Sequence, residues 1–210
     1  MKIRLSNTRG YLKNDMIESR RTFSNNTYWN PRYMNWNNLI KVINDDILQP
    51  GRLIPKHEHK NIDVLGYLVE GKLEHWDSEG NLNTAEPGQI QRMWCGKSIW
   101  HTEKCVSETP ARYLQIWILP NEQDTEPFYE LHNKGIEFGP LGFPMKQNIK
   151  ISGGVITSEK SLNITSPSYL YMVSGTIEGS DFTLNEGDGA ELDPGILSGN
   201  FNGHIILFES

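Results

Sequence analysis

The feature that most constrains this fold is a series of short extended runs, each closed by a turn signal. The runs LIKVIN (39–44), DVLGYLV (63–69), KLEHW (72–76) and RYLQIWIL (112–119) are separated by breakers such as QPG, EG, DSEG and EPG. Strands that recur every ~8–12 residues with turn chemistry between them are typical of an all-β sandwich or barrel. A parallel α/β sheet is excluded because long amphipathic helical patterns are missing from the sequence.

The strand pattern is interrupted once and then resumes. After Pro120 comes the polar stretch NEQDTEP, then FYELHNKG (128–135), which fits one short helix, and further extended runs follow to the end of the chain. YLVEGKLE near 67–74 resembles YMVSGTIE near 171–178, which suggests a duplicated β unit. The sequence therefore predicts two β barrels, residues 1–125 and residues 126–210, with the boundary between about Pro120 and Phe143.

Composition limits the classes of function. The net charge is −6 and no cluster of Lys and Arg interleaves with aromatic residues, so direct nucleic-acid binding is disfavoured. The first residues lack the apolar run of a signal peptide, and no later segment approaches 18 consecutive apolar residues, so we expect a cytoplasmic protein without a membrane partner. Polar edge strands favour a monomer.

Two short motifs carry the candidate chemistry. His57-Glu58-His59 and His101-Thr102-Glu103 each place two metal-ligating side chains at positions i and i+2. Alternate side chains of a strand share a face, so each pair points into the same barrel interior. If the two strands face or neighbour each other, three imidazoles and one carboxylate converge on one point. We therefore predict a metal site made by His57, His59, His101 and Glu103.

Each motif also has a structural explanation. An isolated His-x-His in a β protein is often a turn or a surface feature, and a lone His-x-Glu is weaker still. The two motifs gain weight together because both fall in one predicted barrel and the second barrel has no such pair. His75, His132 and His204 each stand alone in the sequence, and for them a surface or satisfied core position is preferred.

Three neutral imidazoles and a carboxylate form a borderline donor set. It suits one divalent transition metal, Fe(II), Mn, Ni, Cu or Zn, and the donor set does not rank these ions. Four protein ligands leave about two open positions on an octahedral metal, enough for a bidentate substrate or for substrate and dioxygen.

These residues resemble the pirin family. RTFSNNTYWNPRYMNWNNLIKVINDD (21–46), PKHEHKNIDVLGYLVEGKLEHWDSEGN (55–81), PGQIQRMWCGKSIWHTE (87–103) and RYLQIWILP (112–120) match its motifs in order and at matching spacing. The resemblance implies a bicupin, built from two jelly-roll barrels, and a metal, usually iron, bound at the positions of His57, His59, His101 and Glu103. Iron makes Fe(II) the first candidate metal. The second barrel is shortened here, which is a departure from the family pattern. Several family members show quercetin 2,3-dioxygenase activity, and others are described as nuclear cofactors of transcription.

The sequence departs from the family pattern near the site. Where the family commonly has His-Pro-His-Arg and then a Glu three residues after the second His, this chain has His-Glu-His-Lys, and the acid is Asp63. We expect Asp63 to support a ligand imidazole from outside the metal's own ligands. Trp94, Cys95 and Trp100 are expected to place bulky or oxidisable groups near the mouth of the site.

The working hypothesis is a metal-dependent dioxygenase whose small-molecule substrate is a flavonol or another enolic chelator. Glu103 is the candidate general base, because a carboxylate at the metal can take the substrate's proton. Tyr67, Met93 and Trp117 could line the pocket, but barrel core explains each of them better.

Two other functions compete with catalysis. One is a regulator that acts through a protein partner and senses the oxidation state of iron. The other is a thiol sensor built on Cys95 and Cys105, although most such cysteines are buried small hydrophobes.

Overall fold

The computed structural model describes residues 1–25, 28–142, 145 and 147–210. Strands dominate these residues, and the one helix among them is the short 3-10 turn η1 (Ser6–Thr8). The contacts divide the chain into two compact units, which we call the N-terminal unit (Gly10–Gly135) and the C-terminal unit (Ile136–Ser210 with Met1–Arg9). The all-β prediction is confirmed.

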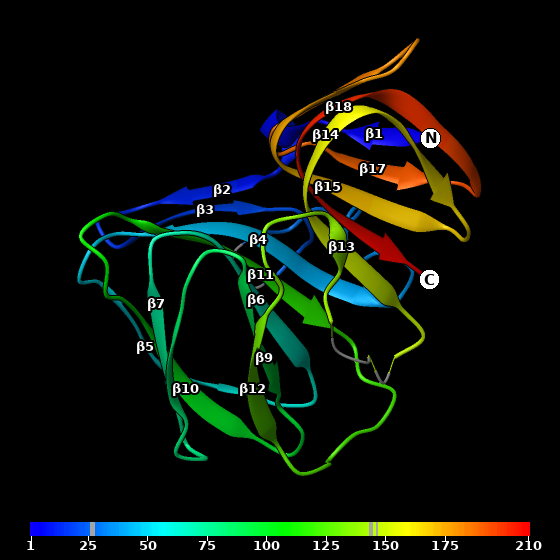
Figure 1. Ribbon diagram of the computed structural model, residues 1–210. Coiled ribbons are helices and arrows are strands. Elements are labelled where there is room, and N and C mark those ends of the chain that lie inside the picture. The colour runs from blue at the N-terminus through cyan, green and yellow to red at the C-terminus, as the bar shows by residue number, and fades with distance from the viewer. Residues whose placement is uncertain (26–27, 143–144, 146) are drawn as a thin grey trace. The chain divides into compact units, whose positions relative to one another are not determined.

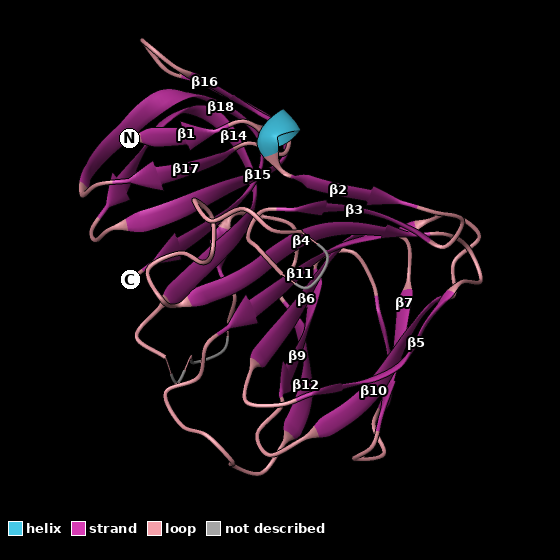
Figure 2. Ribbon diagram, turned by 180° about the vertical axis from the view of Figure 1, so that it is seen from behind, coloured by secondary structure: helices cyan, strands magenta, loops and turns pink. Residues whose placement is uncertain are grey.

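Two antiparallel sheets form the N-terminal unit (Figures 1 and 2). The larger sheet has the order β12 (Phe128–Asn133), β9 (Gln89–Trp94), β6 (Asp63–Glu70), β11 (Ala111–Ile118), β4 (Ile40–Leu48), β3 (Ile17–Arg21) and β2 (Gly10–Lys13). The smaller sheet has the order β5 (Leu53–His59), β10 (Ile99–Cys105), β7 (Leu73–Asp77) and β8 (Leu82–Ala85). In both views β5, β7 and β10 lie opposite β6, β9 and β11.

The turn between β6 and β7 explains why β7 enters the smaller sheet. Gly71 has a φ of +73°, in the left-handed region that favours glycine. A Cβ at this position would lie 2.6 Å from the carbonyl oxygen of Pro110, so a side chain is also excluded by contact. The chain therefore reverses at Gly71 and directs β7 alongside β10.

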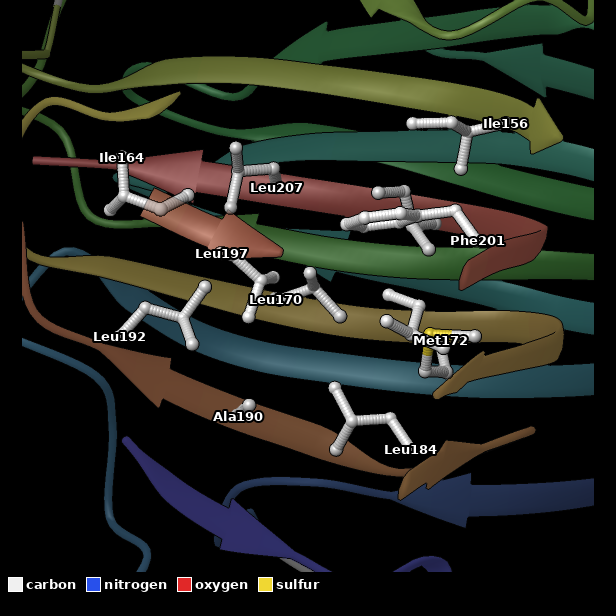
Figure 3. Close-up of a cluster of buried hydrophobic side chains, with 12 residues drawn as sticks. Ile156, Ile164, Leu170, Met172, Leu184, Ala190, Leu192, Leu197, Phe201 and Leu207 are labelled. Atoms are coloured by element: carbon white, nitrogen blue, oxygen red, sulfur yellow. The ribbon is translucent and has the colours of Figure 1, made fainter. Parts of the chain in front are cut away.

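The C-terminal unit is built around one sheet and an apolar core. Its strands follow the order β1 (Lys2–Arg4), β17 (Gly189–Leu192), β15 (Ser168–Glu178), β18 (Gly195–Glu209), β14 (Lys150–Ile164) and β13 (Gly139–Pro140), and β16 (Thr183–Asn185) pairs with β15. Figure 3 shows its buried cluster, in which Leu170, Met172, Phe201 and Leu207 gather with other aliphatic side chains. Burial of this apolar surface stabilises the unit.

The two units differ in extent from the ranges predicted from the sequence. Residues 128–133, expected as a short helix, form β12 instead and pair with β9, which extends the N-terminal unit to Gly135. Cross-strand pairing has overridden the local helical preference there. Met1–Arg9 belongs to the C-terminal unit because β1 pairs with β17. Phe143, the far end of the predicted boundary, lies outside the described residues.

Candidate metal centre

Strands β5 and β10 bring three histidines together. They pair antiparallel, with His101 opposite His57 and Ile99 opposite His59. Directly opposed residues of an antiparallel pair project on the same face, so His57 and His101 meet, and His59 joins them two residues along β5. His59 and His101 are buried and His57 is half-buried. The predicted convergence of these imidazoles is present in the structure.

The spacing of the ring nitrogens fits a bound cation. The Nε2 atom of His57 lies 3.0 Å from Nε2 of His59 and 3.0 Å from Nε2 of His101. Two nitrogens at right angles around a metal, each about 2.1 Å from it, would be about 3.0 Å apart. All three ligand atoms lie within 4.8 Å of one another. The arrangement thus matches adjacent positions on a single metal ion.

The protonation state of the histidines favours metal binding as well. The Nδ1–H of His57 donates to the carbonyl oxygen of Pro55 at 2.9 Å, which directs Nε2 of His57 toward the other two rings. Burial, together with the nearby His57, lowers the pKa of His59 to about 3. Burial and the neighbouring histidines also hold the pKa of His101 far below its ordinary value. Neutral imidazoles with free lone pairs are what a divalent metal requires.

Glu103 lies inside the same barrel, held by hydrogen bonds. A β-bulge between His101 and Glu103 shifts the register of β10 against β5, and the Glu103 side chain stays buried. Its Oε1 accepts from Gln91 Nε2 at 2.8 Å and its Oε2 accepts from the Tyr113 hydroxyl at 3.3 Å. Burial, with a smaller contribution from Asp46, raises the pKa of Glu103 to about 7. This carboxyl can therefore take up or release a proton near neutral pH.

The structure distributes the four predicted ligands over two groups. One group contains His57, His59 and His101, and the other contains His75, His101 and Glu103. Within each group the ligand atoms lie within 4.8 Å of one another, and His101 belongs to both. Glu103 is thus brought to His101, its neighbour on β10, whereas His57 and His59 approach from β5.

His75 was expected to be a surface or satisfied core residue, and it is a buried residue hydrogen-bonded to Asp77, but the sequence did not place it beside His101 and Glu103. The structure buries it on β7, opposite Glu103, with its ring stacked on Tyr129 at 4.3 Å between centroids. The available signal was the spacing of His75 and Asp77, which repeats the i and i+2 pattern of the two metal motifs on a third strand.

The residues expected at the mouth of the site have other positions. Trp94 and Cys95 are buried, and the Trp94 ring stacks on Phe128 while its Nε1–H donates to Thr125. Trp100 is exposed, because it neighbours His101 on β10 and so projects from the opposite face of the strand. These three residues therefore pack or face outward instead of lining an entrance.

Asp63 is paired with a guanidinium group in the interior. It is buried, and both of its oxygens accept hydrogen bonds from the Arg92 side chain at 2.9–3.2 Å. Arg92 also forms an ion pair with Glu130 at 3.2 Å. A buried carboxylate of this kind needs such a partner. The hydrogen bonds found here tie β6 to β9; a role of Asp63 toward a ligand imidazole stays a prediction.

A cavity of about 760 Å³ lies beside Trp117, and none of the three histidines lines it. Trp117 lines this cavity and packs edge-on against His59, with ring centroids 4.9 Å apart. Its other walls include the aromatic side chains of Tyr28 and Trp29 and the cationic side chains of Arg21 and Lys41. The volume is in the range of small-molecule sites. Tyr67 and Met93, by contrast, are buried core residues as expected.

Comparison with known proteins places these observations in a family. A family model described as Pirin matches residues 2–118. Quercetin 2,3-dioxygenase from Escherichia coli K12 is 39% identical over 129 residues, which are 61% of this chain and 55% of that protein. A pirin-like protein from Caulobacter vibrioides is 28% identical over 192 residues, covering 83% of this chain and 82% of that protein.

The fold has a similar match among solved structures. The bacterial pirin YhhW from Escherichia coli, in complex with nickel(II), superposes with a TM-score of 0.90 at 24% identity and covers 99% of this chain and 97% of that one. The all-β bicupin fold is thereby confirmed. Because the match with the Escherichia coli quercetin 2,3-dioxygenase spans 55% of that protein, about half its length, its activity is not transferred by similarity alone.

The family likeness and the histidine groups together suggest a divalent metal. Among the described residues, no helix has the length and apolar character needed to cross a membrane.

Proposed function

The chain belongs to the pirin family, and we propose that it is a metal-dependent dioxygenase of the quercetin 2,3-dioxygenase type. Its substrates would be dioxygen and a flavonol-like or other enolic, chelating small molecule. The observation that carries the proposal is the convergence of three imidazole Nε2 atoms, 3.0 Å apart in two of the pairs. A cavity of about 760 Å³ is lined by Trp117, the residue whose ring packs edge-on against His59. Relatives named quercetin 2,3-dioxygenase support the reaction class.

In this proposal His57, His59 and His101 hold the metal through Nε2, and Glu103 is the fourth ligand. Fe(II) is the first candidate, with Mn, Ni, Cu and Zn as alternatives, because imidazole with carboxylate binds all of these ions. When bound, such a metal supplies Lewis acidity toward the enol oxygens of the substrate and, in the case of iron, redox chemistry toward dioxygen.

Glu103 has the second role of general base. Burial raises the pKa of this carboxyl to about 7 in the absence of metal, so a Glu103 side chain that leaves the metal when the substrate binds can accept the proton of the substrate's hydroxyl group near neutral pH. Gln91 and Tyr113 hold the two carboxyl oxygens in place through their hydrogen bonds. They thereby limit the orientations from which the proton is taken.

The cavity residues orient the substrate. The indole of Trp117 offers an apolar wall next to His59, and the rings of Tyr28 and Trp29 suit a flat aromatic molecule. The cationic groups of Arg21 and Lys41 favour a substrate that is an anion after losing its proton.

The test is oxygen uptake with quercetin, using protein that has been loaded anaerobically with Fe(II). We expect uptake that requires both metal and quercetin, and that falls by about 10²–10⁴-fold per bound metal ion in Glu103→Gln, because that substitution removes the base while retaining the shape of the side chain. Metal content is measured in the same samples, since Glu103 is also a proposed ligand. His132→Gln, which changes a histidine outside both groups, is the matched control and should retain full uptake. Stoichiometric metal without uptake would reject the dioxygenase function and leave a metal-binding role.

A further inference from the structure

We propose that His75 and Asp77 are positioning residues for His101. They would fix which nitrogen of the His101 ring carries its proton, and so leave its Nε2 free to bind metal. The inference rests on the proposed metal site and deepens it, because it explains how a buried imidazole is prepared before any metal arrives.

Asp77, His75 and His101 form one continuous series of hydrogen-bonded side chains across β7 and β10. Nδ1 of His101 lies 3.4 Å from Nδ1 of His75, and Nε2 of His75 lies 3.0 Å from Oδ2 of Asp77. All three side chains are buried, with exposed fractions of 1%. Tyr129 stacks on the His75 ring at an interplanar angle of 13° and so restricts its rotation. Because the three side chains are buried, the hydrogen bond of each one constrains the proton position of the next.

The Asp77 end of this hydrogen-bonded series is held by the turn after β7. Oδ1 of Asp77 accepts from the backbone N–H of Glu79 at 3.0 Å, from the backbone N–H of Asn81 at 3.0 Å, and from the Asn81 side-chain amide at 3.1 Å. A carboxyl group that accepts this many bonds is held as the ionised carboxylate, which has no proton to donate.

The position of each proton in the hydrogen-bonded series follows from Asp77. Because Asp77 can only accept, Nε2 of His75 must donate to it, and the neutral His75 ring then has a bare Nδ1. That nitrogen can only accept, so Nδ1 of His101 carries the proton and donates to it. The remaining nitrogen of His101, Nε2, is then unprotonated, and it lies 3.0 Å from Nε2 of His57, the spacing of two ligands of one cation. Metal ligands of the histidine type are commonly oriented by a partner at the second ring nitrogen.

The same order of protons excludes His75 as a ligand of the metal. A metal held by the group of His75, His101 and Glu103 would need a bare nitrogen on each ring at the contact between His75 and His101. The hydrogen-bonded series that begins at Asp77 instead places a proton between those two nitrogens. The two arrangements require opposite tautomers of His101, and experiments can therefore separate them.

A direct test is to observe the imidazole tautomers in metal-free wild-type protein by long-range ¹H–¹⁵N correlation NMR. We expect His75 protonated at Nε2 and His101 protonated at Nδ1. His101 protonated at Nε2, or His75 protonated at Nδ1, would overturn the proposal. This measurement needs neither a variant nor activity.

A second test uses Asp77→Asn to reverse the direction of the hydrogen bonds in this series. The two backbone N–H groups that now bind Oδ1 would retain the amide oxygen, so the new NH₂ group would replace Oδ2. It would lose the hydrogen bond from Asn81 Nδ2 at 2.9 Å and donate to His75 Nε2. His75 would then carry its proton on Nδ1, and His101 would be forced to carry its own on Nε2, at the metal position. We expect the Kd for Ni(II), measured by calorimetry, to rise by about 10- to 100-fold, the usual effect of losing such a partner.

Asp188→Asn is the matched control. Asp188 is also buried and accepts from two backbone N–H groups, those of Ser6 and Asn185, but it belongs to the C-terminal unit. It should leave Ni(II) affinity unchanged. Circular dichroism and thermal unfolding of each metal-free variant separate loss of affinity from loss of fold, and the NMR test does not depend on either variant folding.

His75→Phe completes the comparison, since it keeps a ring against Tyr129 but removes the acceptor. We expect a smaller rise in Kd than for Asp77→Asn, because His101 becomes free to choose its tautomer and is not forced into the wrong one. Complete loss of stoichiometric Ni(II) binding in His75→Phe, with binding retained in His57→Ala, would show that His75 is itself a ligand and would overturn the proposal. If wild-type protein binds no metal, the proposed function fails, whereas the tautomer assignment is still decided by NMR.

Discussion

The two units are built from the same kind of strand and both contain apolar core clusters, but their buried polar side chains differ. Those of the described N-terminal unit include His59, Asp63, His75, Asp77, Gln91, Arg92, His101 and Glu103, whereas those of the described C-terminal unit are Arg4, Arg9, Gln147, Ser168 and Asp188. Several members of the first set are joined by hydrogen bonds, which buried polar groups need in order to be tolerated. Among the described residues, buried histidines therefore occur only in the N-terminal unit, and its interior is the one suited to metal chemistry.

Matching segments of the two units show where they diverge. YLVEGKLEH (67–75) and YMVSGTIEG (171–179) align without gaps, and Leu73 and Ile177 occupy equivalent buried positions. Two residues further along, the N-terminal unit has His75 and the C-terminal unit has Gly179. The strand pattern is thus shared, while the residue that could carry chemistry is present in only one of these two segments.

The largest effect that would test this contrast is expected from a cavity in the apolar core. Phe201→Ala removes a fully buried ring from the C-terminal unit and should lower the free energy of unfolding by about 3–5 kcal/mol. Denaturant unfolding measures the loss, and Ni(II) calorimetry on the folded variant should give the wild-type Kd. A large change in Kd would show that the two interiors are not functionally separate.

A somewhat smaller effect is expected from metal on the stability of the N-terminal unit. Free Ni(II) at 100 times its Kd should stabilise the protein by about 2.7 kcal/mol through linkage. Hydrogen exchange should show the added protection in β5 and β10, and His57→Ala should abolish it. Equal added protection in wild type and His57→Ala would contradict the assignment of the metal to these strands.

Acid should destabilise the metal-free N-terminal unit in preference to the other. The pKa of His59 is lowered from 6.5 to about 3 by burial and by His57, so the unfolded chain binds this proton more readily than the folded chain does. The contribution of His59 to the free energy of unfolding is therefore fully present above about pH 6.5. As the pH falls from there toward 3, this contribution decreases by ~1.4 kcal/mol per pH unit. Unfolding measured between pH 7 and 5 tests this. A stability that does not change in this range would show that the imidazoles are already satisfied as cations.

Much of this site was predictable from the sequence, because the i and i+2 rule depends only on strand geometry. It correctly placed His57 and His59 together with His101. It could not place Glu103 relative to His57 and His59, because the bulge in β10 shifts the register between His101 and Glu103. It also did not place His75 beside His101 and Glu103, because the partners of His75 come from β10 and from the turn that holds Asp77.

Domain extent was harder to predict for a related reason. Whether residues 128–133 form a helix or a strand is decided by pairing with β9, and the placement of residues 1–9 is decided by pairing with β17. Such long-range partners leave little trace in the local sequence.

The smallest effect is expected at the cysteines. Cys95 and Cys105 are buried and free, and burial raises the pKa of the Cys95 thiol, so little reactive thiolate is present. Peroxide should therefore leave the metal-free protein without a disulfide, and Cys95→Ser should change neither this result nor Ni(II) affinity. Formation of a disulfide that Cys95→Ser prevents would restore the thiol-sensor hypothesis.

The most direct test of the account is the metal content of wild-type protein beside His59→Ala, both loaded anaerobically with Fe(II) and freed of excess metal. The account predicts one metal ion per wild-type chain and none in the variant, with both proteins equally folded. Equal metal in the two proteins, or no metal in the wild type, would contradict the claim that the three imidazoles of the N-terminal unit form a metal site.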